Sequence, residues 1–394
     1  MLTAIDILLL LLAVPAAFAS MYLALATLLS AAPPPPPRSK RAMKFDIMVP
    51  AHNESAVIAR TVESLRAIDW PRDCYRILTI ADNCTDDTAA RARAAGAIAL
   101  ERSNPNERGK GYALDFGFAA SRADGFADAV VVIDADAQVS ENILEAFASR
   151  LERGEQAVQA HYGVLNPMAS WRTRLITIAK ASFHIVRSRA RERIGVSCGI
   201  RGNGWCVTHE LLRAVPYRAF SLTEDLEYGI DLGLAGYRVA YADEAHSDAE
   251  MVSGEQVARN QRQRWERGRF QLVHSKTLPL IRVGARKGSL LCLDLAADLL
   301  VLPLSYIALN IALLFALGLA AAIWFRASTG WVWLGAACAL SVAVYVLRGW
   351  VLSGIGARGL LDLCRAPGFL VWKLLLMLRR RQSAEWVRTE RERP

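Results

Sequence analysis

The stretch that decides the fold is residues 45–95, FDIMVPAHNESAVIARTVESLRAIDWPRDCYRILTIADNCTDDTAARARAA, in which short apolar runs alternate with helical patterns. Residues 45–49 and 77–81 are predicted strands, and residues 54–68 and 86–95 are predicted helices. This alternation is typical of an α/β fold with a mostly parallel sheet.

The same rhythm continues downstream of this stretch. Residues 109–121 and 141–151 are predicted helices, and residues 129–133 and a run near 157–160 are predicted strands. The polar middle of the chain, residues 45–290, is therefore expected to be one α/β domain.

Polar residues follow three of the predicted strands. They read PAHNE at 50–54, DNCTDD at 82–87 and DAD at 134–136. Ligands of open parallel sheets bind at the carboxyl ends of strands, so these clusters are candidate site residues. Each also has a local explanation, since Asp86 can cap a helix and Asn53 can hold a turn.

The acidic pair Asp134 and Asp136 is the most informative of the three clusters about function. Alternate residues leaving a strand can direct one carboxylate to a ribose and the other to a divalent cation. Mg²⁺ and Mn²⁺ prefer such oxygen ligands and bridge phosphates.

Three uncharged stretches outside this domain are long enough for membrane helices. Residues 7–29 predict a first helix, and residues 299–324 and 331–347 predict a membrane hairpin. Residues 369–378 are too short to span and are expected in the interface. A cleaved signal peptide is the alternative for the first stretch, but its only early charge is Asp6 and a positive start is missing.

These features divide the chain into five parts. We expect a transmembrane helix at 1–32, a proline-rich basic linker at 33–44, the catalytic domain at 45–290, a transmembrane hairpin at 291–355 and an interfacial segment with a basic tail at 356–394. The prolines predict a stiff spacer that lifts the domain off the bilayer. Residues 171–193 fit either a bilayer-surface helix or a core-facing helix.

Basic residues set the expected orientation and explain the charge. The linker and the tail from Arg358 onward together account for the whole formal net charge of +9. Both belong on the cytosolic side of an inner membrane, so the domain is expected in the cytosol of a multi-pass protein. The rest of the chain is net neutral, which argues against a nucleic-acid-binding surface. Seven scattered cysteines without C-x-x-C spacing predict neither disulfides nor a zinc site.

Further motifs complete a recognisable set: ERGKG at 107–111, TED at 223–225 and QRQRW at 261–265. Together with the strand-end clusters they resemble the family 2 glycosyltransferases over residues 45–272. The resemblance points to the membrane-bound branch with polysaccharide synthases and ceramide glucosyltransferase-like enzymes. It implies the GT-A nucleotide-diphosphosugar transferase fold, with flanking transmembrane helices.

The resemblance implies a donor site for a UDP-sugar. Asp82 matches the residue that reads the uracil base, and Asp134 and Asp136 match the D-x-D that holds the ribose and the diphosphate-bound Mg²⁺ or Mn²⁺. The other implied donor residues are Pro50, Asn53, Glu54, Lys110 and Gln261. A P-loop around Lys110 is the alternative, but the full G-x-x-x-x-G-K-[ST] pattern is absent.

The implied catalytic residues are Asp225, as general base, with Glu224 as the weaker candidate and Arg264 on the departing diphosphate. Thr223 is a predicted N-cap, and a helix N-terminus favours an ionised carboxylate. Simple dipole complementation is the alternative for this acidic pair.

The implied acceptor-side residues are Trp265, Trp205 and Gly204. Arg264 and Trp265 fall near Gln261 on one helical face, because these positions lie three and four residues apart. The alternative here is a solvated basic helix with one buried indole.

We therefore expect a metal-dependent inverting transferase that moves a sugar from a UDP-sugar to a membrane-associated lipid-linked or glycan acceptor, in exopolysaccharide or glycolipid synthesis. Three membrane helices are too few to enclose a hydrated polymer, which favours a single or short addition with export left to a partner protein. The alternatives are a processive synthase completed by partner subunits and a nucleotide-sensing membrane protein without turnover.

Overall fold

The computed structural model describes residues 4–251, 255–365 and 368, and it leaves the side chains of residues 255–262 undescribed. The predicted interfacial segment at 369–378 and the basic tail beyond it lie outside the described residues.

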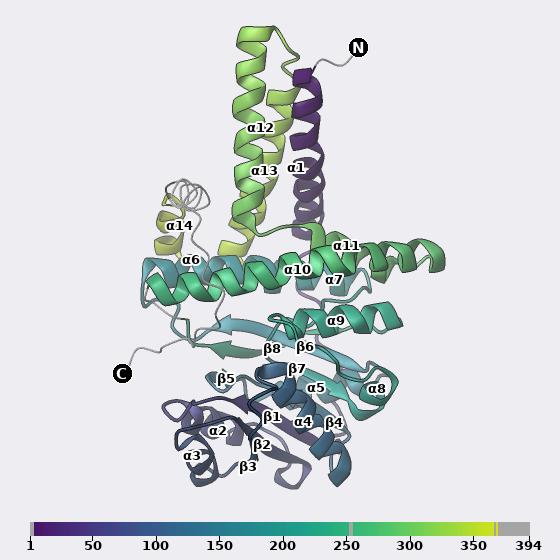
Figure 1. Ribbon diagram of the computed structural model, residues 1–394, viewed down its shortest axis with the longest axis vertical. Helices are drawn as coiled ribbons and strands as arrows, with labels where there is room; N and C mark the ends of the chain where they lie inside the picture. Colours follow the sequence, from purple (N-terminus) through teal and green to yellow (C-terminus); the bar gives the residue numbers. More distant parts are fainter. Residues whose placement is uncertain (1–3, 252–254, 366–367, 369–394) are drawn as a thin grey trace.

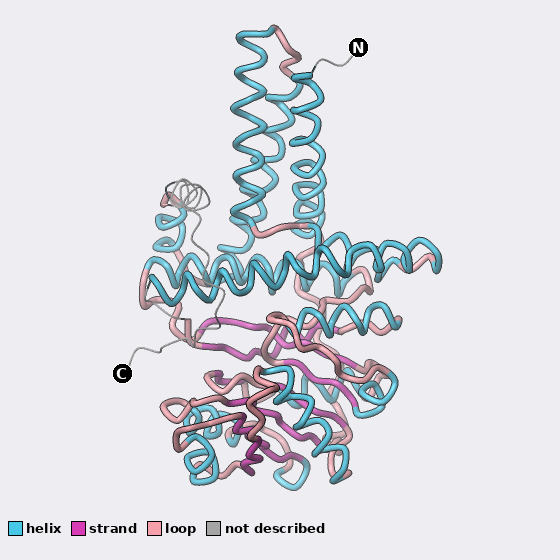
Figure 2. The backbone as a smooth tube through the Cα atoms, in the orientation of Figure 1, coloured by secondary structure: helices cyan, strands magenta, loops and turns pink. Residues whose placement is uncertain are grey.

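The domain is built on an eight-stranded mixed sheet with the order β3-β2-β1-β4-β7-β6-β8-β5 (Figure 2). The pairs β3-β2, β2-β1, β1-β4 and β6-β8 are parallel, and β4-β7, β7-β6 and β8-β5 are antiparallel. The strands are β1 (Phe45–Ala51), β2 (Tyr75–Asp82), β3 (Ile98–Arg102), β4 (Ala129–Val132), β5 (Ala137–Val139), β6 (Ala157–Val164), β7 (Trp205–Thr208) and β8 (Ala240–Ala249).

Both faces of the sheet are covered by helices, which explains why the central strands are apolar runs. In β1, Phe45 and Ile47 pack into one core with α2 (Ile58–Arg66), α3 (Thr88–Ala94) and α5 (Ile143–Leu151). Met48 faces the opposite core with α4 (Lys110–Asp124), α8 (His209–Ala214) and α9 (Glu224–Ala235). Successive side chains of a strand point to opposite faces, so one strand serves two cores.

The prediction of an α/β fold is confirmed, and the predicted strands at 45–49, 77–81, 129–133 and 157–160 correspond to β1, β2, β4 and β6. The parallel character holds for the β3-β2-β1-β4 half. The sequence did not predict β3, β5, β7 and β8. Among these, β5, β7 and β8 form the antiparallel pairs that make the second half of the sheet mixed.

A layer of helices crosses between the sheet and the long helical bundle (Figure 1). It contains α6 (Trp171–Lys180), the π-helix η2 (Ala181–Val186), α7 (Arg187–Arg193), α10 (Glu255–Lys287) and α11 (Leu290–Leu300). The Tyr345 hydroxyl of the bundle donates to the Ser182 carbonyl at 2.7 Å. Ser182 and Arg187 are buried, so in the 171–193 segment η2 and α7 follow the core-facing alternative.

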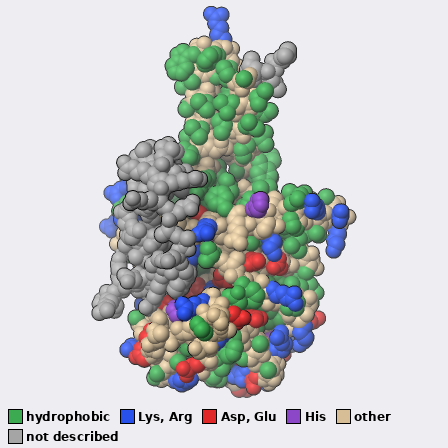
Figure 3. Space-filling view, in the orientation of Figure 1, with side chains coloured by type: hydrophobic (Ala, Val, Ile, Leu, Met, Phe, Trp, Pro, Cys, Tyr) green, Lys and Arg blue, Asp and Glu red, His purple; other side chains and the backbone are tan. Residues whose placement is uncertain are grey.

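The bundle consists of α1 (Ala4–Leu28), α12 (Leu304–Phe325) and α13 (Gly330–Ser353), all long and apolar enough to cross a membrane. Its surface is mainly hydrophobic, whereas charged side chains gather on the sheet-bearing part (Figure 3). The hairpin begins at Leu304 and not at residue 291, because α11 belongs to the crossing layer and buries Asp294 and Asp298.

The proline-rich linker runs along the domain and is bonded to α5. The Ser39 backbone N–H donates to Glu145 at 2.6 Å, and Arg153 donates to the Pro37 carbonyl at 2.6 Å. The linker therefore holds the first helix close to the domain. This corrects the expectation that the linker is a stiff spacer that lifts the domain off the bilayer. A last short helix, α14 (Ala357–Leu363), is joined to α6 by the Arg174–Asp362 ion pair at 2.6 Å.

Candidate active site

A single cavity of about 1540 Å³ runs from the carboxyl ends of β1, β2 and β4 to the base of the helical bundle. Its sheet end is lined by Asp82, Asp134 and Asp136, and its far end by Leu304 and Val342. The strand-end clusters therefore meet in one place, as the sequence predicted.

Asp82 ends β2 and lies at the sheet end of the cavity. Its Oδ1 accepts hydrogen bonds from Arg102 Nη1 at 2.7 Å and Asn83 Nδ2 at 3.1 Å, and its backbone carbonyl lies 2.7 Å from His52 Nδ1. Arg102 was missed in the sequence, because it comes from the unpredicted strand β3 and reaches Asp82 only through strand pairing. His52 belongs to the PAHNE cluster that the sequence had indicated.

The residues at the carboxyl end of β1 and in the loop that follows it divide into two groups. Pro50 and Glu54 line the cavity, as expected for donor-site residues. Asn53 has a positive φ of 56°, and its Oδ1 accepts the Thr85 backbone N–H at 2.7 Å. Asn53 therefore stabilises the loop, as the turn interpretation predicted. It does not line the cavity.

Lys110, the first residue of α4, joins three parts of the site. Its Nζ donates to Asp134 Oδ1 at 2.6 Å and to the Gly202 carbonyl at 2.8 Å, and lies 3.6 Å from Glu224 Oε1. Burial alone would lower the pKa of Lys110, but Asp134, Glu224 and Asp225 together raise it, so it stays a cation.

Glu224 and Asp225 occupy the first turn of α9 at the cavity wall, as predicted. Thr223 holds the N-cap position, but its side chain makes no capping hydrogen bond. Burial raises the pKa of Glu224 to about 7 and raises that of Asp225, although Lys110 opposes both shifts. The expected stabilisation of the ionised form by the helix terminus is thus outweighed by burial, which makes Asp225 a stronger base.

Gly202 brings the backbone close to Asp225. Its φ is +99°, and a Cβ there would lie 3.1 Å from Asp225 Oδ2. Any side chain would crowd the carboxylate, so the close approach of the backbone at this position requires a glycine.

The Q-x-x-R-W motif lies in α10. Arg264 and Trp265 line the cavity, and Trp265 is 40% exposed, so a sugar ring can stack on it. Arg264 Nε is buried and has no hydrogen-bond partner among the described residues. The side chain of Gln261 lies outside the described part of the chain.

Trp205 and Gly204 do not reach the cavity, contrary to the acceptor-side expectation. Trp205 is 1% exposed in β7 and packs against Phe118 and Tyr228. At Gly204, a Cβ would lie 2.7 Å from Ser247 Cβ, so this glycine serves strand packing. The reason is that β7 is an interior strand with both faces covered.

Lys180 is a cavity residue that the sequence did not single out. Its Nζ lies 3.1 Å from the ring centroid of Tyr162, and burial lowers the pKa of Lys180 to about 7. It comes from α6, in the 171–193 segment for which the sequence left a bilayer-surface helix and a core-facing helix open. Among the described residues, no group of three or more His, Cys, Asp or Glu side chains is placed to hold a metal alone.

Residues 42–268, more than half of the chain, match the family model described as "Glycosyltransferase like family 2". The chain is 26% identical over 243 residues to "Probable glycosyltransferase YdaM" of Bacillus subtilis, covering 59% of this chain and 57% of that protein. It is 29% identical over 235 residues to a "Beta-monoglucosyldiacylglycerol synthase" of Synechocystis sp., covering 57% and 47%. The chain thus spans about half the length of these curated relatives.

Among solved structures, the mannosyltransferase PcManGT from Pyrobaculum calidifontis, in complex with GDP-Man and Mn²⁺, is similar to this chain with a TM-score of 0.52. The identity is 19%, and the match covers 87% of this chain and 98% of that one. This likeness confirms the predicted GT-A fold.

Substitution of two tryptophans tests whether Trp205 lies in the core and Trp265 at the cavity. Trp205→Ala should lower the free energy of unfolding by about 3–5 kcal/mol, because it leaves a large core cavity. Trp265→Ala, at an exposed cavity position, should leave the thermal unfolding temperature nearly unchanged and raise the KM for the acceptor. Thermal unfolding and steady-state kinetics of both variants check this, and the reverse pattern would contradict the two placements.

Proposed function

The chain belongs to glycosyltransferase family 2, and we propose that it transfers a sugar from a UDP-sugar to a membrane-associated lipid-linked or glycan acceptor, with inversion and with a divalent metal. The site faces the cytosol at the inner membrane, and the product belongs to glycolipid or exopolysaccharide synthesis.

The observation that carries this proposal is the continuous cavity from the strand-end carboxylates to the membrane helices. Its far wall includes Leu304 and Ala308 of α12 and Val342 and Val346 of α13. These apolar side chains belong to candidate membrane spans. A lipid can therefore keep its tail at the bundle while its head group reaches Asp225.

The chemical step uses residues from the two walls of the cavity. Asp225 accepts the proton of an acceptor hydroxyl as that oxygen attacks the anomeric carbon. The bond from this carbon to the UDP oxygen breaks on the opposite side, so an α-linked donor gives a β-linked product. Arg264, whose Nε has no described partner, is placed to stabilise the charge on the departing diphosphate.

Asp134 and Asp136 fit a divalent metal that also binds the donor diphosphate. Both line the cavity, and Mg²⁺ or Mn²⁺ is commonly held by one or two carboxylates plus substrate phosphates. Asp134 Oδ1 is bonded to Lys110, and Asp136 is the carboxylate of the D-x-D that we assign to the metal. When bound, the metal supplies neutralisation of the developing diphosphate charge. The Mn²⁺ in the PcManGT complex supports this assignment.

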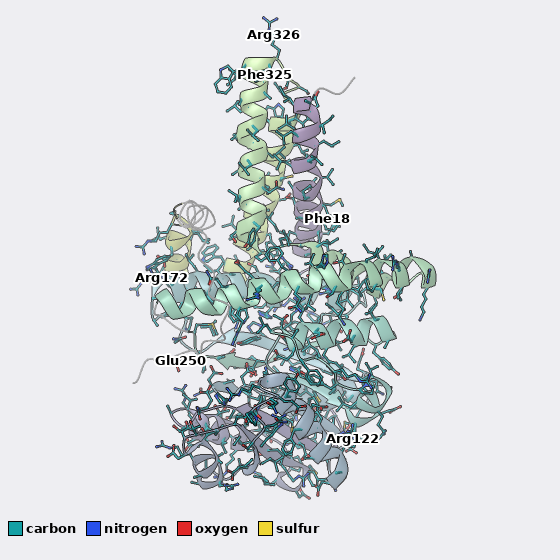
Figure 4. All side chains as sticks on the ribbon, viewed as in Figure 1. Phe18, Arg122, Arg172, Glu250, Phe325 and Arg326 are labelled. Carbon is teal, nitrogen blue, oxygen red and sulfur yellow. The ribbon has the colours of Figure 1, made fainter. Side chains whose placement is uncertain are left out.

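The distribution of basic residues supports the cytosolic orientation. Arg326 lies at the far tip of the bundle beside Phe325 (Figure 4). It is the one basic residue in the turn between α12 and α13, whereas the linker at the opposite end carries Arg38, Lys40, Arg41 and Lys44. Positive charge is retained on the cytosolic side, so the domain lies there.

The size of the bundle favours a discrete lipid product over a polymer. The described residues contain three candidate spans, which are too few to enclose a hydrated chain. The name of the Synechocystis relative, a monoglucosyldiacylglycerol synthase, supports the same choice. Export would then fall to a partner protein. A processive synthase completed by partner subunits is the second candidate.

Asp225→Asn should leave UDP affinity nearly unchanged and lower transfer by about 10²–10⁴-fold, because it removes the proton acceptor and keeps the donor pocket. Calorimetry with UDP and turnover with membrane lipid extract measure the two effects. The matched control is Asp231→Asn in the same helix, where Asp231 pairs with Lys276 at 2.5 Å. Turnover near wild type in Asp225→Asn would remove this residue from the mechanism.

Asp136→Ala should abolish the dependence of UDP affinity on Mn²⁺ or Mg²⁺, because it removes the direct metal ligand. UDP binding is measured with each metal and with a chelator. Asp124→Ala, at an exposed carboxylate that pairs with Arg76, serves as the control and should keep the metal effect. A full metal effect in Asp136→Ala would contradict the ligand assignment.

A further inference from the structure

Four buried arginines and two buried aspartates lie between the sheet domain and the bundle. This arginine cluster consists of Arg187, Arg191, Arg201, Arg269, Asp294 and Asp298, each at most 9% exposed. Two carboxylates cannot balance four guanidinium groups, so two positive charges remain in excess. Buried charge without a counter-charge is costly, which raises the question of what anion completes the cluster.

Two of the arginines are well partnered. Arg187 Nη1 lies 3.1 Å from Asp298 Oδ1, and its Nε donates to the Tyr345 hydroxyl at 3.0 Å. Arg191 Nε lies 2.6 Å from Asp294 Oδ2, and its Nη1 lies 3.2 Å from Asp298 Oδ2. These pairs use the two carboxylates and join the crossing layer together.

Arg201 has the most unused hydrogen-bonding capacity of the four arginines. Two of its nitrogens have no partner among the described residues, against one each for Arg191 (Nη2) and Arg269 (Nε). Arg201 Nε donates to the Cys198 carbonyl at 2.9 Å, but Nη1 and Nη2 make no hydrogen bond among the described residues. Nη1 lies 3.6 Å from Asp298, whose carboxylate is shared with other arginines. Burial lowers the pKa of Arg201, and the nearby Arg191 and Arg187 lower it further although Asp298 opposes them.

The open side of the cluster faces the cavity. Arg187, Arg201 and Arg269 all line it, and the guanidinium carbon of Arg201 lies 4.1 Å from the ring centroid of Phe183. Arg201 directly precedes Gly202, which adjoins the Asp225 carboxylate. An anion held there would lie between the proposed base and the apolar residues of α12 and α13 that line the same cavity.

We propose that the arginine cluster binds the phosphate group of the acceptor lipid, so that the acceptor is a phosphate-bearing membrane lipid with a free hydroxyl. Paired N–H groups of a guanidinium match phosphate oxygens, and the two terminal nitrogens of Arg201 are buried with no hydrogen-bond partner among the described residues. The phosphate places the hydroxyl beside Asp225, which takes its proton while the oxygen bonds to the anomeric carbon and UDP leaves. This inference rests on the proposed function.

The test measures binding separately from turnover, with the purified full chain in non-ionic detergent. Dihexanoyl phosphatidylglycerol and neutral dihexanoylglycerol are the probes, and inorganic phosphate is the competitor. The wild type should bind the phospholipid at least about tenfold more tightly, the range expected for charged hydrogen bonds. Arg201→Gln should reduce this ratio to about twofold, with UDP affinity unchanged.

Two further variants guard against a folding artefact. Arg201→Lys keeps the charge and should retain part of the preference, and Arg189→Gln, whose parent residue pairs with Asp243 at 2.7 Å, should retain all of it. Equal binding of the two lipids by the wild type, or an unchanged ratio in Arg201→Gln, would overturn the inference. Displacement of the phospholipid by micromolar inorganic phosphate would also overturn it, by showing a site for the free anion.

Turnover with the same lipids separates the two claims. Transfer to dihexanoylglycerol without any preference for the phospholipid would reject the phosphate site and leave the proposed function standing. A clear binding preference without transfer to any lipid in a membrane extract would reject the proposed function itself.

Discussion

One partly buried ammonium group holds the parts of the candidate site together. Lys110 Nζ is bonded to Asp134 at the end of β4 and to the Gly202 carbonyl, and it lies 3.6 Å from Glu224 at the start of α9. The site has carboxylates on both walls, and these would repel one another without a cation between them. Lys110 therefore allows the wall with Asp134 and the wall with Glu224 and Asp225 to face each other across one cavity. We propose that the first binds the metal and that the second supplies the base.

The half of the site built on parallel strands could be predicted from the sequence. Buried parallel strands are apolar runs, and their carboxyl ends carry Asp82, Asp134 and Asp136, so both the fold and this cluster follow from local pattern. Trp205 was misplaced because a motif match does not tell whether a side chain points to a cavity or to the core. Arg102 and Lys180 were missed because only tertiary packing brings them to the site.

The junction with the bundle shows a second limit of sequence reasoning. The sequence predicted a transmembrane hairpin at 291–355, but α11 at its start lies across the domain. There Asp294 and Asp298 pair with Arg191 and Arg187, which lie more than a hundred residues earlier in the chain. Such pairing over long sequence separations has no local signature. The crossing layer also joins the domain to the apolar helices, whose side chains line the far end of the cavity. In our proposal, this arrangement links membrane attachment with the choice of acceptor.

The central claim is that the sugar goes to a membrane lipid at the mouth of this cavity. The most direct measurement is mass spectrometry of the products made by the full chain in liposomes containing membrane lipid extract, supplied with a panel of UDP-sugars. We predict a discrete, lipid-extractable product carrying one or a few added sugars, formed with stoichiometric release of UDP. A long polymer made by the chain alone and found across the vesicle membrane would contradict the account.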